Sequence, residues 1–366
     1  GTATTADNDY VNNDGSLNFT GTASETQTIT VLVNGDTAIE ADETFDVNLG
    51  AISGTSGSVD TADISTANSP QTGTILNDDL ATVTLSGGIA QNEGNTGTTA
   101  YIFTATLDVA VSGGFDLAYT TDDGTAIEAD NDYVNNDGTI SFTGNAGETQ
   151  TITVDVNGDT DVELDETFTV ALGAVSGTTG VDPADITTAG SPQTGTILND
   201  DIDLAIGATD ADKAEGDAGN TSFTFTITRT GVTAGDTTVD YAVTGDGANP
   251  ADAADFGGVF ANDTITFNGS ETVQTVTIDV SGDTAIEPDE GFIVTLSNPS
   301  GNAEIATATA TATIQNDDST TVTLSGGIAQ SEGDAGTISY VFTATLDTAV
   351  SGGFDLPYTT HDGSAT

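Results

Sequence analysis

Long stretches of this sequence occur more than once, and this internal repetition limits the possible folds more than any other feature. The repeated segments are TVTLSGGIAQ at 82–91 and 321–330, ADNDYVNNDG at 6–15 and 129–138, and SPQTGTILNDD at 69–79 and 191–201. Aligning them predicts four tandem copies of one unit: copy 1 (1–79, the later part of a unit), copy 2 (80–201), copy 3 (202–318, more divergent) and copy 4 (319–366, the earlier part of a unit). Whatever one copy folds into, the others are expected to repeat.

Inside each copy the apolar residues alternate with polar ones. In TQTITVDV, Ile152, Val154 and Val156 fall on one side, and the polar residues that alternate with them, two Thr and one Asp, fall on the other, which is the pattern of a strand with one buried face. AYIFTATL and TFTVAL repeat it, and turn-forming runs such as NNDG and VNGD separate the strands. About seven short strands per copy, with no helical period, predict an all-β fold of tandem Greek-key β-sandwiches.

The junctions between copies contain no flexible linker. ILNDDLATVTL and ILNDDIDLAI run from the last strand of one copy to the first strand of the next, with paired Asp residues at the seam. We therefore expect neighbouring sandwiches to abut in a rod. The chain opens on GTAT and closes on GSAT, the same phase of the unit, which favours a window cut from a longer array. In an alternative, the end fragments complement each other between subunits.

The charge balance excludes some partners. Asp and Glu number 58 and Lys and Arg only 2, a formal net charge of −56. Nucleic acid and anionic membrane surfaces both require Lys and Arg contacts to phosphate, so neither is an expected partner. Small cations must offset the self-repulsion of a compact chain so charged. The two basic residues, Lys213 and Arg229, are expected to be surface charges.

Composition also bears on location and chemistry. Without Cys the chain forms no disulfide and no thiolate zinc site. No apolar run reaches the length of a membrane span and no leader opens the chain. Because it begins with Gly1, we expect an internal or processed piece of a longer protein, with any export signal outside it. His361 is the only histidine and is expected to be a solvated loop residue.

Acidic residues recur at the same loops in every copy, as in NGDTDVELDETF. Calcium takes six to eight oxygen ligands from carboxylates, carbonyls and water, and such loops supply them at one end of a sandwich. The predicted ligands are Asp9, Asp36, Glu40, Glu43, Asp78 and Asp79 in copy 1; Glu93, Asp132, Asp159, Asp161, Glu163, Glu166, Asp200 and Asp201 in copy 2; Glu215, Asp255, Asp283, Glu287, Glu290, Asp317 and Asp318 in copy 3; and Glu332 in copy 4.

The repeats also separate side-chain ligands from backbone ligands. The position of Asp161 is Ala38 in copy 1 and Ala285 in copy 3, so a shared contribution there must come from the carbonyl oxygen. The loop is not an EF-hand, because Leu164 stands where that loop requires Gly.

The run GETQTITVDVNGDTDVELDETFTVALG followed by TGTILNDD, and its counterpart in copy 3, resembles the Calx-beta domain across essentially the whole chain. The resemblance is carried by the E-x-D-E-x-F and N-D-D motifs. It implies immunoglobulin-like sandwiches, calcium as the bound ion, and the predicted copy 2 residues as ligands, with Asp161 coordinating through its backbone. Gly158 and Asn199 depart from the acidic residues of some members, which implies fewer or weaker sites.

Two alternatives compete with calcium binding. Salt adaptation produces a similar charge total, with the carboxylates as solvated surface. A two-carboxylate glycosidase is disfavoured because aromatic residues are 6% of the chain, Trp is absent and the acids recur at seams. The long segment 173–195, which joins the last two strands of copy 2, is either a contact surface or a passive flap.

Together these features predict a non-enzymatic, structural role. We expect a calcium-stiffened segment of a secreted or cell-surface adhesin, stalk or filament, whose partners are calcium ions, neighbouring repeats and other copies in a filament. A regulatory calcium sensor is the alternative.

Overall fold

The computed structural model describes residues 1–363, which form an all-β chain divided into two compact units. Unit 1 comprises residues 1–159 and 165–198, and unit 2 comprises 160–164 and 199–366. No α-helix occurs among the described residues, and so none there is long and apolar enough to cross a membrane.

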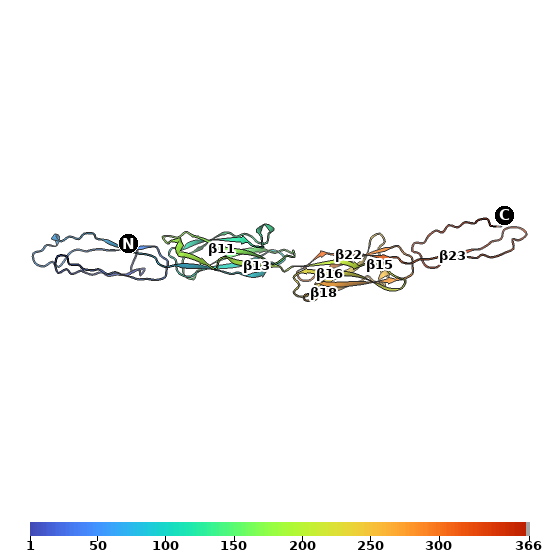
Figure 1. The fold of residues 1–366 in the computed structure, drawn as a ribbon, viewed down its shortest axis with the longest axis horizontal. Coiled ribbons are helices and arrows are strands. Elements are labelled where there is room, and N and C mark those ends of the chain that lie inside the picture. The colour runs from blue at the N-terminus through green and yellow to red at the C-terminus, as the bar shows by residue number, and fades with distance from the viewer. Residues whose placement is uncertain (364–366) are drawn as a thin grey trace. The chain divides into compact units, whose positions relative to one another are not determined.

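Copy 2 folds as a sandwich of two sheets, which confirms the predicted fold class. Its strands are β5 (Ala81–Ser86), β6 (Ala90–Asn92), β7 (Thr98–Leu107), β8 (Phe115–Asp123), β9 (Gly138–Phe142), β10 (Thr149–Asn157), β11 (Glu166–Ser176), β12 (Ile186–Ala189) and β13 (Gln193–Leu198), with 3-10 turns η2 (Glu128–Asp130) and η3 (Pro183–Asp185). The sheet orders are β10-β7-β5-β12 and β6-β13-β11-β8-β9. Figure 1 labels β11 and β13.

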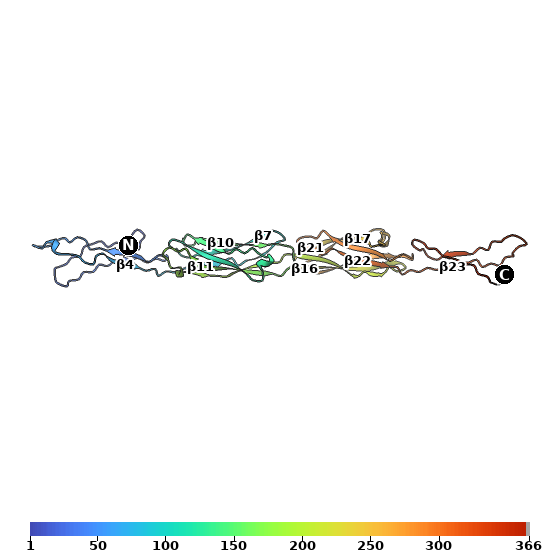
Figure 2. The ribbon, with the colours of Figure 1, turned by 90° about the horizontal axis from the view of Figure 1, so that it is seen from above.

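Copy 3 repeats this topology strand for strand. Its strands are β14 (Ile202–Asp210), β15 (Asp212–Ala214), β16 (Gly219–Gly231), β17 (Thr237–Asp246), β18 (Asn262–Phe267), β19 (Val273–Gly282), β20 (Glu290–Ser297), β21 (Ala303–Thr307) and β22 (Thr309–Gln315), with the turn η4 (Ala254–Phe256). The orders are β19-β16-β14-β21 and β15-β22-β20-β17-β18, and Figure 2 shows β16, β17, β21 and β22 from above.

Each full copy therefore has nine strands instead of the expected seven or so. The additional strands are short and pair in parallel: β12 with β5 and β6 with β13 in copy 2, and β21 with β14 and β15 with β22 in copy 3. They lack the long apolar alternation that identified the others. The β12 pairing lies within the segment 173–195, so part of that segment is sheet.

Copies 1 and 4 hold only two-stranded sheets within the described residues. Their elements are β1 (Tyr10–Val11), β2 (Leu32–Val33), β3 (Glu43–Val47), β4 (Gln71–Ile75) and the turn η1 (Thr61–Asp63) in copy 1, and β23 (Val322–Ser325) and β24 (Thr343–Leu346) in copy 4. Large apolar side chains such as Phe19 and Phe342 are exposed here.

The apolar side chains of the alternating pattern face the cores of the sandwiches. Ile152, Val154 and Val156 of β10 are each at most 1% exposed. At the centre of copy 2, Phe168 stacks on Tyr133, and in copy 3 Phe292 takes the equivalent place among aromatic rings. Both phenylalanines lie two residues after a predicted ligand, so the core anchors one strand of each acidic loop cluster.

Candidate metal centres at the ends of the repeats

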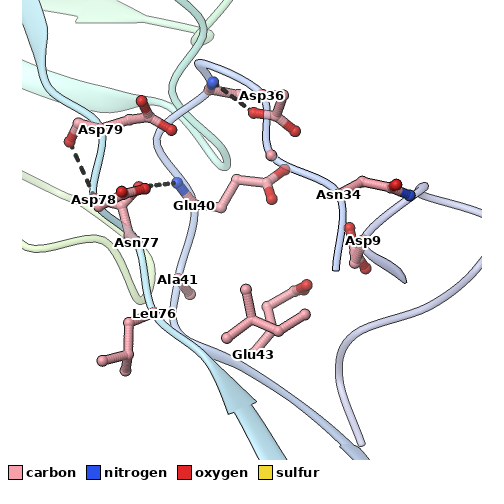
Figure 3. Close-up of a pocket in the computed structure, with 13 residues that line it drawn as sticks. Asp9, Asn34, Asp36, Glu40, Ala41, Glu43, Leu76, Asn77, Asp78 and Asp79 are labelled. Atoms are coloured by element: carbon pink, nitrogen blue, oxygen red, sulfur yellow. Dashed lines mark hydrogen bonds between the residues drawn. The ribbon is translucent and has the colours of Figure 1, made fainter. Parts of the chain in front are cut away.

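In copy 1 three predicted ligands meet in one pocket. Carboxylate oxygens of Asp9, Glu40 and Glu43 all lie within 4.8 Å of one another. Figure 3 shows these side chains and Asp36 facing a common space. The lining residues are Asp9, Asn34, Gly35, Asp36, Ala38, Glu40, Ala41, Glu43, Ile75, Leu76, Asn77, Asp78 and Asp79.

A short backbone contact orients the first aspartate of each site. One carboxylate oxygen accepts a hydrogen bond from a backbone N–H three or five residues earlier: Asp9 from Thr4 (2.6 Å), Asp132 from Ile127 (2.7 Å) and Asp255 from Asp252 (2.6 Å). Each of these aspartates also offers one carboxylate oxygen to an acidic group of its copy. This local turn fixes the direction of the side chain before any ion binds.

The asparagine of the N-D-D motif holds the acidic loop in place. Its side-chain oxygen accepts the backbone N–H of the loop glutamate in three copies: Asn77 from Glu40 (3.3 Å), Asn199 from Glu163 (3.3 Å) and Asn316 from Glu287 (3.0 Å). Asn199, a departure from the acidic residue of some family members, thus has a positioning role that the sequence did not reveal.

Copy 3 brings five of its seven predicted ligands together in two groups. Oxygens of Asp255, Glu287 and Glu290 lie within 4.8 Å of one another, and so do those of Asp217, Asp317 and Asp318. In the second group, Asp318 Oδ2 is buried without a hydrogen-bond partner among the described residues. Buried polar atoms are nearly always paired. An oxygen in this condition is suited to a cation.

Glu215 lies buried between these two groups. Its side chain is 5% exposed, and its pKa is raised to about 7 by burial, then by the charges of Asp283, Glu287, Asp255 and Asp318. Those charges include members of both groups. Predicted ligand Asp283 is itself exposed, and it accepts a hydrogen bond from the Ala285 N–H through Oδ1 (2.6 Å).

The acidic groups repel one another when no cation is present. Burial first, and then Asp255 and its neighbours, raise the pKa of Glu290 to about 7. Burial and nearby carboxylates also raise the pKa values of Asp255, Glu287 and, in copy 1, Glu40 and Glu43. The shifts have the same direction in copies 1 and 3, where the oxygens of each acidic group lie within 4.8 Å of one another.

The predicted ligands of copies 2 and 4 are placed as follows. Asp132 and Glu166 offer oxygens within 4.8 Å of each other. Glu93 is buried after β6, Asp159, Asp161 and Glu163 lie in the loop between β10 and β11, and Asp200 and Asp201 follow β13. Glu332 is exposed, and among residues 1–363 it joins no acidic group able to hold an ion.

Gly158 is required by close backbone packing. A Cβ atom at this position would lie 1.8 Å from the carbonyl oxygen of Gly94, and one at the equivalent Gly282 would lie 2.0 Å from that of Gly216. An aspartate therefore does not fit here, which explains the departure from acidic family members.

Asp217 is a site residue that sequence reasoning missed. It stands two residues after the predicted ligand Glu215 and groups with Asp317 and Asp318. The equivalent position is Asn95 in copy 2 and Asp334 in copy 4. The sequence signal that could have identified it is the polar residue that recurs at the third position of E-G-D and E-G-N.

Neither basic residue of the chain neutralises these clusters. Lys213 pairs with Asp210 (2.5 Å). Arg229, contrary to its prediction as a surface charge, is 1% exposed and donates to the carbonyls of Gly235 and Thr233 and to Thr237 Oγ1. The expectation failed because backbone carbonyls, which no sequence pattern signals, satisfy the guanidinium. With oxygen-only donors, the residues present fit a hard cation such as Ca²⁺.

The fold and these loops define a class of tandem β-sandwich repeats with acidic ends. The chain belongs to the Calx-beta domain family, which matches residues 1–80, 88–201 and 208–320. These domains are non-catalytic modules.

Two crystal structures are among the solved structures to which the chain is similar. The crystal structure of the apo form of the Calx CBD1 domain has 24% identity, covers 32% of this chain and 98% of its own, and has a TM-score of 0.28. The crystal structure of CBD12 from CALX1.2 has 18% identity, covers 64% and 99%, and has a TM-score of 0.31. Comparison with curated proteins finds no match.

The raised pKa values predict how pH affects the calcium-free protein. The folded pKa of Glu215 and of Glu290, about 7, lies above the ordinary 4.5, so the folded state keeps protons that the unfolded state releases. This contribution to stability is complete below about pH 4.5 and is lost as pH rises through 7. In chelator, we expect the melting temperature of copy 3 to fall between pH 5 and pH 8, measured by calorimetry of the full chain. A melting temperature constant over this range would contradict the packing described for these carboxylates.

Proposed function

We propose that this chain is a calcium-binding structural segment of a secreted or cell-surface repeat protein, such as an adhesin shaft, stalk or filament. It is not an enzyme, and its partners are calcium ions, its own neighbouring repeats and further copies in a filament. The observation that carries the proposal is the acidic group Asp255, Glu287 and Glu290, with the equivalent Asp9, Glu40 and Glu43 two copies away.

Bound calcium would offset negative charge that the protein's own cationic side chains do not neutralise. The chain carries a net charge of −56, and its two cationic side chains are engaged elsewhere. A divalent ion shared by three carboxylates replaces their repulsion with coordination and orders the loop that bears them. Calcium sites of extracellular modules bind at about 10⁻⁴ to 10⁻³ M, which suits a medium rich in calcium.

The position of the loops supports a mechanical role. In unit 1 the N-D-D asparagine that holds the acidic loop of copy 1 also touches copy 2 directly: Asn77 Nδ2 donates to Asp185 Oδ2 (3.2 Å). Asp185 lies in segment 173–195, so this segment supplies a contact surface to the preceding copy. Ordering the loop with calcium therefore also orders a junction between repeats.

Small-angle scattering of the full chain tests this role. In calcium we expect a longer maximum dimension and a stiffer particle than in excess chelator, and magnesium at equal concentration reproduces only a small part of the change. A scattering profile that ignores chelator would contradict the structural proposal.

A further inference from the structure

The acidic loop contains one apolar residue that does not face its own copy. Ile39 stands between the predicted ligands Asp36 and Glu40, yet it is 0% exposed and belongs to the hydrophobic core cluster of copy 2. A side chain from one repeat thus completes the core of the next.

Backbone hydrogen bonds fix this residue in place. The Ile39 N–H donates to the Ala110 carbonyl (2.9 Å), and the Ser112 N–H donates to the Ile39 carbonyl (2.8 Å). The result is an isolated parallel bridge between Ile39 and Val111. Neither residue of this bridge belongs to a strand, and both are buried (Ile39 0% and Val111 2% exposed), so the bridge is a contact made between the two copies.

The same backbone bridge occurs independently in unit 2, where Ile286 is half-buried. The Ile286 N–H donates to the Ala349 carbonyl (3.0 Å), the Ser351 N–H donates to the Ile286 carbonyl (2.8 Å), and Ile286 bridges Val350. Ile286 of copy 3 is equivalent to Ile39, and Ala349–Ser351 of copy 4 repeats the Ala-Val-Ser sequence of copy 2. Two separate junctions therefore use one geometry.

Copy 2 carries Val162 at the position of Ile39. The segment of copy 3 that corresponds to Ala110–Ser112 also differs in sequence. The loop 160–164 is part of unit 2 with copy 3, and a Cβ on Gly231 would lie 3.1 Å from Val162 Cγ1. Copy 3 has no Ala-Val-Ser here but Gly231-Val232-Thr233. The smaller side chain of Val162 thus occurs together with the different sequence at 231–233, as is expected where two surfaces pack closely against each other.

We propose that the aliphatic residue at the centre of each acidic loop is a plug that fastens its repeat to the following one. The plug residues are Ile39, Val162 and Ile286. Because ligands flank the plug on the same short loop, docking of the plug and binding of calcium are one cooperative event. The coupling to calcium rests on the proposed function, whereas the docking of the plug does not.

Hydrogen exchange of the full chain tests the plug. In Ile39→Ala we expect the amides of Ile39 and Ser112 to exchange at least about tenfold faster, in chelator and in calcium alike, because their bonds depend on docking. Ile39→Val, which mimics copy 2, keeps most of the protection. Ile64→Ala, an exposed isoleucine of the same copy, is the control and changes neither amide. Protection of β7 verifies that copy 2 remains folded.

The coupling between docking and calcium binding is measured separately. Its readout is the calcium concentration at which the amides of residues 36–43 become protected from hydrogen exchange. We expect Ile39→Ala to move this midpoint at least about threefold higher. Unchanged exchange at Ser112 would overturn the plug, and faster exchange with an unmoved midpoint would overturn the coupling. If the unaltered chain gains no protection from calcium while Ile39→Ala still accelerates exchange, the proposed function fails and the plug stands.

Discussion

Replacing Glu290 by Gln is expected to raise the melting temperature in chelator and to lower it in calcium. In chelator at pH 8 the carboxylate, whose pKa is raised to about 7, ionises against Asp255 and Glu287, and removing its charge relieves that cost. The gain is on the order of 1 kcal/mol, since one pKa unit corresponds to about 1.4 kcal/mol and solvent screens part of the repulsion at this half-buried carboxylate. In calcium the variant loses a ligand, and linkage at a hundredfold excess over Kd is worth about 2.7 kcal/mol.

Glu304→Gln is the matched control for this reversal. Glu304 is an exposed glutamate of the same copy on β21, away from both acidic groups. Its substitution is expected to change the melting temperature little in either buffer. If Glu290→Gln melted lower in both buffers, the carboxylate would be a structural hydrogen-bonding group, and the cation site at Asp255, Glu287 and Glu290 would be refuted.

Truncating Phe292 to Ala is expected to be the most destabilising single change in copy 3. The ring is 0% exposed and contacts Phe223, Phe225 and Phe256 at centroid distances of 5.6, 6.0 and 5.2 Å. Such truncations cost about 3–5 kcal/mol. For a domain of this size the melting temperature falls by roughly 10–20 °C. Calorimetry of the full chain measures it.

Calcium affinity of copy 3 is expected to fall with the same substitution, because Glu290 begins the strand that Phe292 anchors. Val259→Ala provides the control, since this side chain is 71% exposed and its loss changes stability by no more than about 0.5 kcal/mol. A Phe292→Ala variant as stable as Val259→Ala would contradict the assigned core.

Much of the fold could be predicted from alternation alone. Ile152, Val154 and Val156 face the core because a strand with one buried face must alternate, and the repeats extend this pattern from copy to copy. The short parallel strands β6 and β12 could not be predicted in this way. Their pairing depends on which strands the loops bring alongside them. With only three or four residues each, they are too short for an alternating pattern to identify them as strands.

The candidate site was predicted in part for a similar reason. Recurrence across copies identified Asp9, Glu40 and Glu43, which the structure brings together. The positioning role of Asn77 and the docking of Ile39 depend on contacts between segments far apart in sequence. Raised pKa values likewise follow from burial and spacing, which exist only in the folded chain. The repeat boundaries and the ligand set as a whole stay predictions.

The measurement that tests the central claim most directly is thermal unfolding of the full chain in calcium, in magnesium and in excess chelator. If the acidic loops bind calcium in the folded state, the melting temperature rises with calcium concentration, as ligand linkage requires, and magnesium at equal concentration gives a much smaller rise. Equal melting temperatures in calcium and in chelator would contradict the account and would assign the carboxylates to solvated, salt-adapted surface.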